Sequence, residues 1–372
     1  MTAIHLLADQ HIPFVDLFFP EPFTIDRYDP DDGPTTDQLA RADAMLIRTV
    51  TKVDETMIRR APSLKLVCSA TAGYDHLDFD LLASHNIKPG WAAGCNARSV
   101  AEYVGSAMIV WAEEHQVDLT ELSVGIIGEG HAGSAVRKVL ERLGCKCISH
   151  DPPRQERESG WSGATAEEVL ACDVLTFHTG LDQYPDHPTR HWLNRERLET
   201  CNARLIINAA RGGIVDENAL LDHKKHHPTD LILDVWEDEP RFSSGSARSA
   251  WLATPHIAGY SRQSKFRGTQ MSAETIHRFF GVDSTLPTNL PTETGLPDLS
   301  RYISSSELIR TVHPIFPIHE NLQKIALESD DDKRSSQFLN LRVRYPSPDE
   351  WQAMDIPNEA LQRFPELAAL TE

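Results

Sequence analysis

The amino-acid sequence predicts an α/β protein built from two parallel sheets covered by helices, followed by a C-terminal tail. Three observations support this prediction. Strand-like apolar runs alternate with helical patterns over residues 123–254, a weaker alternation occupies the first hundred residues, and a proline-bearing segment introduces the tail. The 372 residues exceed the usual size of one domain. A hydrophobic content of 40% with 24% charged residues excludes a wholly disordered or fibrous protein.

The first domain is expected to be the smaller one. Its buried strands are predicted from three apolar runs: Ile4–Ala8, Ala44–Arg48 and Leu64–Ser69. A long helical pattern from Ala97 to Glu114 should lead into the second domain. Another, from about Ser261 to Phe280, is expected to return the chain to the first. We therefore place the first domain at residues 1–97, completed by residues 258–286.

The second domain, residues 98–257, contains six further strand-like runs. They are Ser123–Gly128, Cys145–His150, Asp173–His178, Arg204–Ala209, Asp230–Val235 and Trp251–Thr254. Their onsets lie roughly 20 to 30 residues apart, the length of a strand plus a crossover helix. This rhythm predicts a parallel sheet with helices on both faces and right-handed crossovers.

The tail, residues 287–372, follows a segment that we interpret as a linker. Leu286–Pro297 contains three prolines among threonines and an asparagine. The tail carries no motif with assignable chemistry, but it does contain apolar residues: Leu308, Ile309, Ile315, Phe316, Ile318, Leu322 and Ile325. Such a short segment is marginal as a separate fold, so we expect these residues to pack against a second copy in a homodimer. Packing on its own subunit is the alternative.

Composition narrows the classes of partner and compartment. The sequence has no apolar run long enough to cross a bilayer and no basic, apolar leader, so we expect neither a membrane anchor nor a secretory signal. A net charge of −19 argues against nucleic-acid and anionic-membrane partners. The six cysteines form no C-x-x-C pair, which is typical of reduced thiols in a cytoplasmic protein. His223, His226 and His227 fit a solvated helix end better than a metal site, so no metal is expected.

A dinucleotide-binding pattern begins where the first strand of the second domain ends. Gly128, Gly130 and Gly133 fit G-x-G-x-x-G, in which the glycines permit a tight turn, close approach to a pyrophosphate and close helix packing. Asp151 follows the next strand, where a carboxylate would bind the ribose hydroxyls. An ordinary helix cap and a loop acid are the alternative. Asp151 would repel a 2′-phosphate and so favours NAD over NADP, although Arg154 lies three residues further on.

Three candidate catalytic residues follow later strands of the same sheet: Arg211, Glu239 and His256. An arginine can hold a substrate carboxylate and polarise the adjacent oxygen. A histidine can exchange a hydroxyl proton near neutral pH, and a neighbouring acid fixes its tautomer. Alone, each could be structural: a surface ion pair, a turn acid before Pro240 or a packed histidine. Together, behind a dinucleotide loop, they favour hydride transfer at a carbon that bears oxygen.

Over about residues 40–280, these motifs resemble the D-isomer-specific 2-hydroxyacid dehydrogenases. The segments that match the family are Asn208–Gly213, Asp234–Pro240 and Thr254–Tyr260. A finer resemblance, to one branch of the family, rests on Arg48–Val53, Ala70–His76, Ala93–Asn96, Asp151–Arg154, Thr176–Thr179 and His256–Tyr260. The resemblance implies a Rossmann-type doubly wound NAD domain, a smaller flavodoxin-like substrate domain and a C-terminal α+β dimerisation domain. The finer resemblance is to a branch of the family that oxidises a small phosphorylated 2-hydroxy acid in vitamin B6 synthesis.

The resemblance also implies individual binding roles. It assigns substrate contacts to Thr49, Thr71 and Tyr260, catalysis to Arg211, Glu239 and His256, and NAD contacts to Asp151, Thr179, Ala209, Ala210, Arg211, Asp234 and Gly259. The tail departs from the family pattern, because Pro348 and Asp349 stand where two basic residues usually follow a tyrosine. The candidates that remain for a phosphate contact are Arg48, Lys52 and Arg344.

Two alternative functions stay open at this level. One is a related dehydrogenase that acts on phosphoglycerate, glyoxylate or hydroxypyruvate. The other is a non-catalytic, NAD-sensing co-repressor, since the same fold also serves as a binding module. Loss of the arginine, glutamate or histidine would favour the second, and the sequence retains all three.

Overall fold

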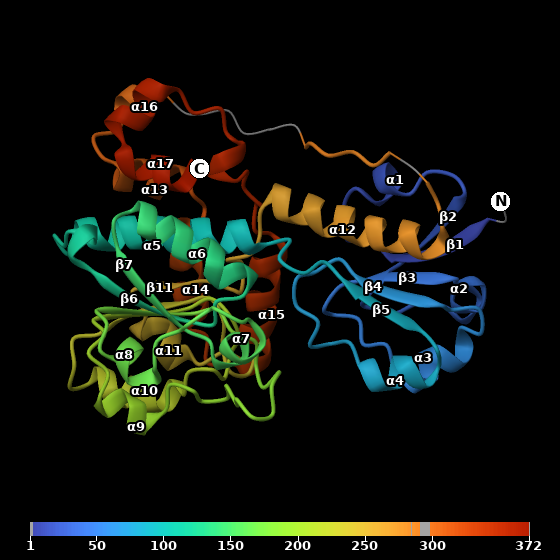
Figure 1. Ribbon diagram of the computed structural model, residues 1–372, viewed down its shortest axis with the longest axis horizontal. Coiled ribbons are helices and arrows are strands. Elements are labelled where there is room, and N and C mark those ends of the chain that lie inside the picture. The colour runs from blue at the N-terminus through green and yellow to red at the C-terminus, as the bar shows by residue number, and fades with distance from the viewer. Residues whose placement is uncertain (1–2, 284, 291–297, 372) are drawn as a thin grey trace. The chain divides into compact units, whose positions relative to one another are not determined.

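The computed structural model describes residues 3–283, 285–290 and 298–371 (Figure 1). The chain divides into two compact units, residues 1–96 with 261–291 and residues 97–260 with 292–372. Most of the predicted linker, residues 291–297, lies outside the described residues.

The first unit is a parallel sheet in the order β2-β1-β3-β4-β5, which is the flavodoxin-like order. Its strands are β1 (Ile4–Asp9), β2 (Phe23–Tyr28), β3 (Ala44–Ile47), β4 (Leu66–Ser69) and β5 (Lys88–Trp91). Its helices are α1 (Val15–Phe18), α2 (Thr36–Arg41), α3 (Glu55–Arg60), α4 (Phe79–Ser84) and α12 (Arg262–Phe280). The predicted β1, β3, β4 and α12 are confirmed within two residues at each end.

The two strands that the sequence did not predict are the edges of this sheet. β2 mixes exposed polar residues with apolar ones, and β5 contains Pro89 and Gly90. Proline and glycine argue against a central strand but are tolerated at an edge. The missing neighbour on one side therefore explains why their sequences lack the apolar runs of β1, β3 and β4.

The second unit contains a parallel sheet in the order β11-β10-β9-β8-β6-β7, which confirms the predicted doubly wound sheet. Its strands are β6 (Ser123–Ile127), β7 (Lys146–His150), β8 (Val174–Phe177), β9 (Leu205–Asn208), β10 (Asp230–Leu233) and β11 (Leu252–Ala253). The order of the strands reverses between β6 and β8, and ligands bind at the carboxyl ends of the strands at such a point.

Helices cover this second sheet. They are α5 (Ala97–Glu114), α6 (His131–Arg142), α7 (Pro152–Arg157), α8 (Ala166–Leu170), α9 (Arg195–Glu199), α10 (Glu217–Lys224) and α11 (Ser244–Ser249), with a 3-10 turn at Leu119–Glu121. Beyond β7, where a Rossmann sheet usually has a third strand, the described chain forms none; Ala164 N donates to Ser149 O at 2.7 Å, and His150 Nδ1 lies 2.9 Å from Ala164 O.

Within residues 298–371 the tail forms helices and 3-10 turns joined by irregular segments, with no strand, so the expected α+β character is wrong. Its elements are 3-10 turns at Leu299–Arg301 and Trp351–Ala353 and helices α13 (Ser305–Val312), α14 (Ile315–Ile325), α15 (Asp331–Val343), α16 (Asn358–Arg363) and α17 (Pro365–Thr371). The apolar residues of α14 recur at helical rather than strand spacing, which accounts for the difference.

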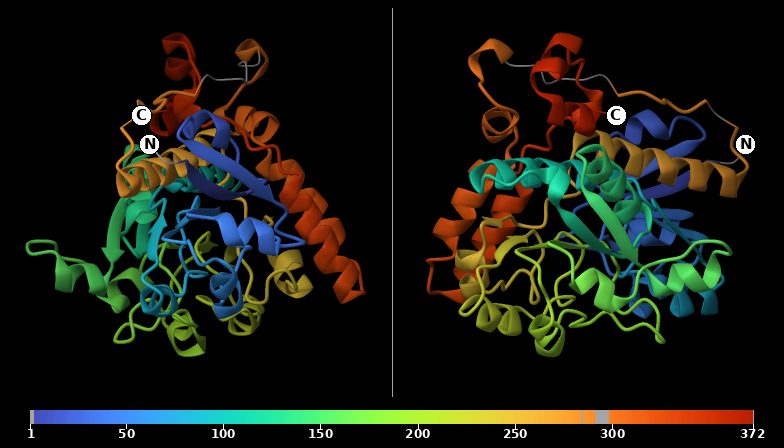
Figure 2. Two further views of the ribbon diagram at one scale, coloured as in Figure 1. Left: turned by 90° about the vertical axis from the view of Figure 1, so that its right-hand side faces the viewer. Right: turned by 60° about the vertical axis from the view of Figure 1, so that its left-hand side comes forward.

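The apolar residues of the tail pack within their own chain, contrary to the expectation that they would bury against a second copy. Leu308, Ile309 and Ile315 join the core under α5, and Leu322 joins the core around β8 and β9. Figures 1 and 2 show α13 and α17 beside α5 and α14 beside β11. The tail is therefore an integral layer of the second unit.

One buried acid anchors the tail to α5. Glu102 accepts hydrogen bonds from Trp351 N at 2.8 Å and from Arg98 Nε at 2.7 Å, and Ser99 Oγ donates to Glu350 at 2.8 Å. Burial, together with the nearby Glu350 carboxylate, raises the pKa of Glu102 to about 8. Docking of the tail therefore places two carboxyl groups in one buried region.

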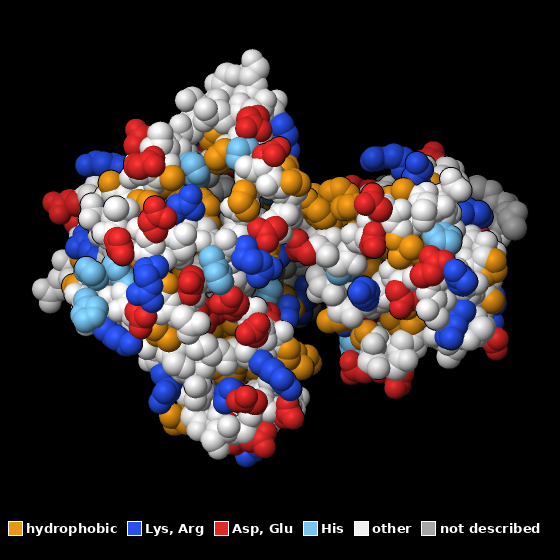
Figure 3. Space-filling model, turned by 90° about the horizontal axis from the view of Figure 1, so that it is seen from below, with side chains coloured by type: hydrophobic (Ala, Val, Ile, Leu, Met, Phe, Trp, Pro, Cys, Tyr) orange, Lys and Arg blue, Asp and Glu red, His pale blue; other side chains and the backbone are white. Residues whose placement is uncertain are grey.

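No helix of the described chain is both long and apolar enough to cross a membrane. On the face drawn in Figure 3, acidic side chains lie among lysines, arginines and histidines instead of gathering in one patch. This agrees with the even spread of charge along the sequence.

Candidate active site

The dinucleotide loop lies between β6 and α6, as the sequence predicts. Gly128 has a φ of +86°, which favours glycine, and a Cβ there would lie 2.8 Å from Thr179 N. A Cβ on Gly133 would lie 2.0 Å from Gly128 O, whereas one on Gly130 would meet no atom within 4 Å. Two glycines thus allow close packing, and Gly130 leaves open space in front of the helix N-terminus, where backbone N–H groups bind phosphates.

Asp151 lies directly behind this loop, at the end of β7. Its carboxylate accepts hydrogen bonds from Glu129 N at 2.8 Å and from Arg154 N at 3.0 Å. The buried Glu129 side chain forms ion pairs with Arg137 at 3.1 Å and Arg154 at 3.2 Å. Arg154 is paired further with Glu158 at 2.7 Å. The acid within the loop is therefore held by arginines and its charge is offset.

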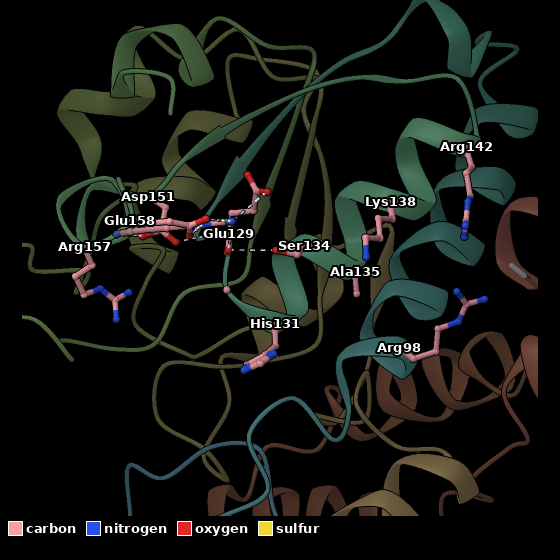
Figure 4. A pocket seen from close by; sticks show the side chains of 12 residues that line it. Arg98, Glu129, His131, Ser134, Ala135, Lys138, Arg142, Asp151, Arg157 and Glu158 are labelled. Carbon is pink, nitrogen blue, oxygen red and sulfur yellow. Dashed lines mark hydrogen bonds and ion pairs between the residues drawn. The ribbon is translucent and has the colours of Figure 1, made fainter. Parts of the chain in front are cut away.

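A cavity of about 860 Å³ opens at this loop, and its lining is shown in Figure 4. His131 and Ser134 lie near its centre, with Asp151 towards one end and Lys138 towards the other, and Gly130 is also part of the lining. The size falls in the range of sites for small molecules. Open space above Gly130, free helix N–H groups and the Asp151 carboxylate fit a dinucleotide.

The predicted catalytic arginine lies in the loop after β9, which Asn208 shapes. The buried Asn208 side chain accepts from Ala210 N at 3.2 Å and donates to Arg211 O at 3.0 Å. A Cβ on the next residue, Gly212, would lie 1.7 Å from Trp236 O. The loops that follow β9 and β10 therefore touch, and only glycine fits between them. Ala209, Ala210 and Arg211 thus lie at the carboxyl edge of the sheet.

Asp234, directly after β10, organises the loop that carries the histidine. Its carboxylate accepts from Thr254 Oγ1 at 2.6 Å, Ile257 N at 2.7 Å and Ala258 N at 2.9 Å. His256 N donates to Asp234 O at 2.7 Å, and His256 has a left-handed φ of 58°. Backbone strain of this kind persists only where the surroundings enforce it, and it concentrates at functional sites. Burial raises the pKa of Asp234 in spite of these bonds.

Glu239 and His256 form the pair that the sequence predicts. His256 Nδ1 lies 2.8 Å from Glu239 Oε2, while Glu239 Oε1 accepts from Trp236 N at 3.0 Å. Burial alone would raise the pKa of Glu239, but His256 and Arg342 lower it below its usual value. The ionised carboxylate accepts a hydrogen bond from Nδ1–H, which leaves Nε2 as the nitrogen that can take up a proton.

Arg342, on the tail helix α15, is a member of this group to which the sequence assigned no role. Its Nη1 lies 3.9 Å from Glu239 Oε2, and its Nε donates to Tyr260 Oη at 3.1 Å. Gly259 and Tyr260 follow His256 in the same loop. A resemblance of the tail to a family segment was the only signal at Arg342, because nothing local in the sequence places α15 at this loop.

The remaining predicted substrate residues lie in the first unit. Thr49 and Thr71 follow β3 and β4, which are neighbours in a parallel sheet, so both lie at one edge. Thr71 Oγ1 is within 2.7 Å of the buried Ser69 Oγ, which is also 2.9 Å from His76 Nε2. Arg48, a candidate phosphate ligand, already forms an ion pair with the buried Asp9 at 2.8 Å.

Comparison with known proteins identifies the family. The model for the D-isomer specific 2-hydroxyacid dehydrogenase NAD binding domain matches residues 98–258. An erythronate-4-phosphate dehydrogenase of Tolumonas auensis is 33% identical over 95% of both chains, and that of Pseudomonas paraeruginosa is 39% identical over 92% of both. The chain belongs to the erythronate-4-phosphate dehydrogenase family. The sequence resemblance is therefore confirmed, as is the NAD-binding character of residues 98–258.

Solved structures agree with the family at the level of the fold. NAD-bound 3-phosphoglycerate dehydrogenase of Entamoeba histolytica superposes with a TM-score of 0.63 at 21% identity, over 77% of this chain and all of that one. D-Lactate dehydrogenase of Aquifex aeolicus, complexed with NAD and lactic acid, gives 0.58 at 22% identity, over 74% and 95%. Erythronate-4-phosphate dehydrogenases thus share the fold of other D-2-hydroxyacid dehydrogenases.

Proposed function

We propose that the protein oxidises 4-phospho-D-erythronate to (R)-3-hydroxy-2-oxo-4-phosphooxybutanoate with NAD, as a step of pyridoxal 5′-phosphate biosynthesis. The carrying observation is the His256–Glu239 pair at 2.8 Å, in a chain that matches erythronate-4-phosphate dehydrogenases over nearly its whole length. Neither the phosphoglycerate or glyoxylate alternative nor the co-repressor alternative is favoured by these relatives.

The residues divide the work as follows. His256 Nε2 takes the proton of the substrate hydroxyl, and Glu239 stabilises the imidazolium that results. Arg211 holds the substrate carboxylate through its planar fork of N–H donors. NAD, when bound, supplies the hydride acceptor.

The binding residues extend this proposal. Asp151 accepts hydrogen bonds from the ribose hydroxyls of NAD, and the backbone around Gly130 binds the pyrophosphate. Thr179, Ala209, Ala210, Asp234 and Gly259 complete the cofactor contacts. Thr49, Thr71 and Tyr260 contact the substrate.

Purified protein should reduce NAD with D-erythronate 4-phosphate and much more slowly with 3-phosphoglycerate. Absorbance of the reduced nicotinamide follows the reaction. Faster turnover of 3-phosphoglycerate or of hydroxypyruvate would show that the proposed substrate is wrong. No turnover of any of these compounds would favour the alternative function as a non-catalytic co-repressor.

We further propose that the protein acts in the cytoplasm as a homodimer. All six cysteines are free thiols, as expected of a reducing compartment. Leu339 and Val343 are exposed on the outer face of α15, one helical turn apart, with exposed fractions of 45% and 82%. Leu339→Glu with Val343→Glu should give monomers by light scattering while the unfolding midpoint is retained. If the doubly substituted chain stays dimeric, the dimer interface does not include Leu339 and Val343.

A further inference from the structure

The tail contributes one cation to the catalytic region, although Arg342 is 82 residues from Tyr260 in the sequence. Its guanidinium lies over the Tyr260 ring, 5.6 Å from the centroid, and Nε donates to the phenol oxygen at 3.1 Å. Nη1 approaches Glu239 Oε2 at 3.9 Å. One half-buried guanidinium on α15 therefore bridges a residue proposed to bind substrate and a residue proposed to act in catalysis.

The hydrogen bond from Arg342 to Tyr260 determines where the phenol proton of Tyr260 can point. A phenol oxygen that accepts a hydrogen bond from a guanidinium must direct its own proton elsewhere, because Arg has no acceptor. Tyr260 is thereby biased to act as a donor. A donor suits the substrate class of the proposed function, whose carboxylate and phosphate carry only acceptor oxygens when ionised.

The contact with Glu239 concerns the carboxylate oxygen that also binds His256 Nδ1. A second cation at 3.9 Å favours the ionised carboxylate without replacing the 2.8 Å bond to the imidazole. The charged groups around Glu239 are then His256 from the loop after β11, Arg342 from α15 and, next to His256, Asp234 after β10.

We propose that Arg342 is a positioning residue that couples the C-terminal tail to catalysis: it orients Tyr260 as a donor to the anionic substrate and holds Glu239 as the ionised partner of His256. This inference rests on the proposed function for the identity of the substrate. The role towards Tyr260 requires the N–H that the guanidinium directs at the phenol oxygen, whereas the role towards Glu239 requires only a positive charge, which a lysine would retain.

Steady-state kinetics of Arg342→Gln and Arg342→Lys test the proposal. Loss of a hydrogen bond with a charged group corresponds to about a 10- to 100-fold effect, and we expect that rise in KM for D-erythronate 4-phosphate in both variants. In Arg342→Gln alone, the low-pH limb of kcat/KM should move to higher pH, because Glu239 loses a cation that lowers its pKa. Lys333→Gln, which removes an exposed charge from the same helix, should match the wild type.

A carboxyl ¹³C NMR titration of Glu239 provides a readout that needs no substrate. Glu239 should protonate at a higher pH in Arg342→Gln than in the wild type or in Lys333→Gln. If the wild type fails to oxidise the phosphorylated substrate, the proposed function fails, while this titration still decides the role of Arg342 towards Glu239.

The unfolding midpoints of all variants separate positioning from support of the fold. A lower midpoint in Arg342→Gln with an unmoved low-pH limb, an unmoved Glu239 titration and an unchanged KM would overturn the proposal and make Arg342 purely structural. A raised KM and a shifted low-pH limb of kcat/KM, with an unchanged unfolding midpoint, support the proposed role of Arg342.

Discussion

Two loops at the carboxyl edge of one sheet each hold a glutamate, buried in the first and half-buried in the second, and the two glutamates have opposite roles. After β6, Glu129 forms ion pairs with two arginines, which balance its negative charge. After β10, Glu239 faces an imidazole at 2.8 Å and a guanidinium only at 3.9 Å. In the proposed function, the first loop binds NAD through its backbone, so its glutamate has a structural role. The second loop acts through side chains, so its glutamate keeps a negative charge that faces the imidazole.

The difference teaches where each loop should be sensitive. A loop that binds a ligand through backbone N–H groups depends on glycines, because they leave room for the ligand and for close packing. A loop that acts through side chains depends on the chemical identity of a few residues. Substitutions can therefore separate the two loops by which quantity changes: turnover, cofactor affinity or stability.

His256→Asn should give the largest effect, a loss of about 10²–10⁴-fold in turnover, because general acid–base catalysis contributes that much. Asparagine tolerates the left-handed backbone at this position, so the fold should survive. NAD affinity, measured by fluorescence titration, should barely change. A variant with near-normal turnover would contradict the role of His256.

Asp151→Ala tests whether the carboxylate behind the glycine loop binds the ribose of NAD. NAD binding should weaken by about 1.5–3 kcal/mol, the scale of a hydrogen bond to a charged group, and the preference for NAD over NADP should narrow. Titration with both cofactors measures the change. Unchanged affinities would mean that another residue binds the ribose.

Gly133→Ala and Gly130→Ala should separate packing from binding in the same loop. The added methyl at Gly133 would meet Gly128 O at 2.0 Å, so the free energy of unfolding should fall by about 1–3 kcal/mol. At Gly130 the methyl meets open space, so stability should be retained while NAD binding weakens. Urea unfolding and NAD titration distinguish the two, and equal losses of stability would refute the contrast.

Glu102→Gln should have the smallest effect, on the pH dependence of stability. Burial raises the pKa of the Glu102 carboxyl to about 8 in the folded protein, whereas the unfolded chain releases this proton near the ordinary pKa of about 4.5. The folded state then binds more protons between these values, so stability falls as pH rises. The variant should flatten this fall in urea midpoints. Glu359→Gln, at an exposed position of α16, should keep the wild-type slope.

The sequence predicted most of what depends on local pattern. Buried strands such as β6 and β9 are mostly apolar, and the glycine spacing together with Asp151 predicted the loop that we propose binds the cofactor. The edge strands β2 and β5 were missed because half of their surface has no neighbour to demand apolar residues. The family resemblance brought Arg211, Glu239 and His256 together.

The placement of the tail could not be predicted in the same way. Leu308 and Leu322 are apolar whether they face a second copy or their own chain, and only tertiary packing decides between the two. The same holds for Arg342, whose contacts with Tyr260 and Glu239 depend on how α15 docks.

The pairing of Arg154 has a consequence for redesigning the coenzyme preference. Its guanidinium is engaged by Glu129 and Glu158 and lies 4.9 Å from the centre of the Trp161 ring. Removing Asp151 would lift the repulsion of a 2′-phosphate without offering that phosphate a partner. A switch to NADP therefore needs a second substitution, at Glu129 or Glu158, that frees the guanidinium of Arg154. This arginine already lies just after the carboxyl end of β7, where it could bind the 2′-phosphate.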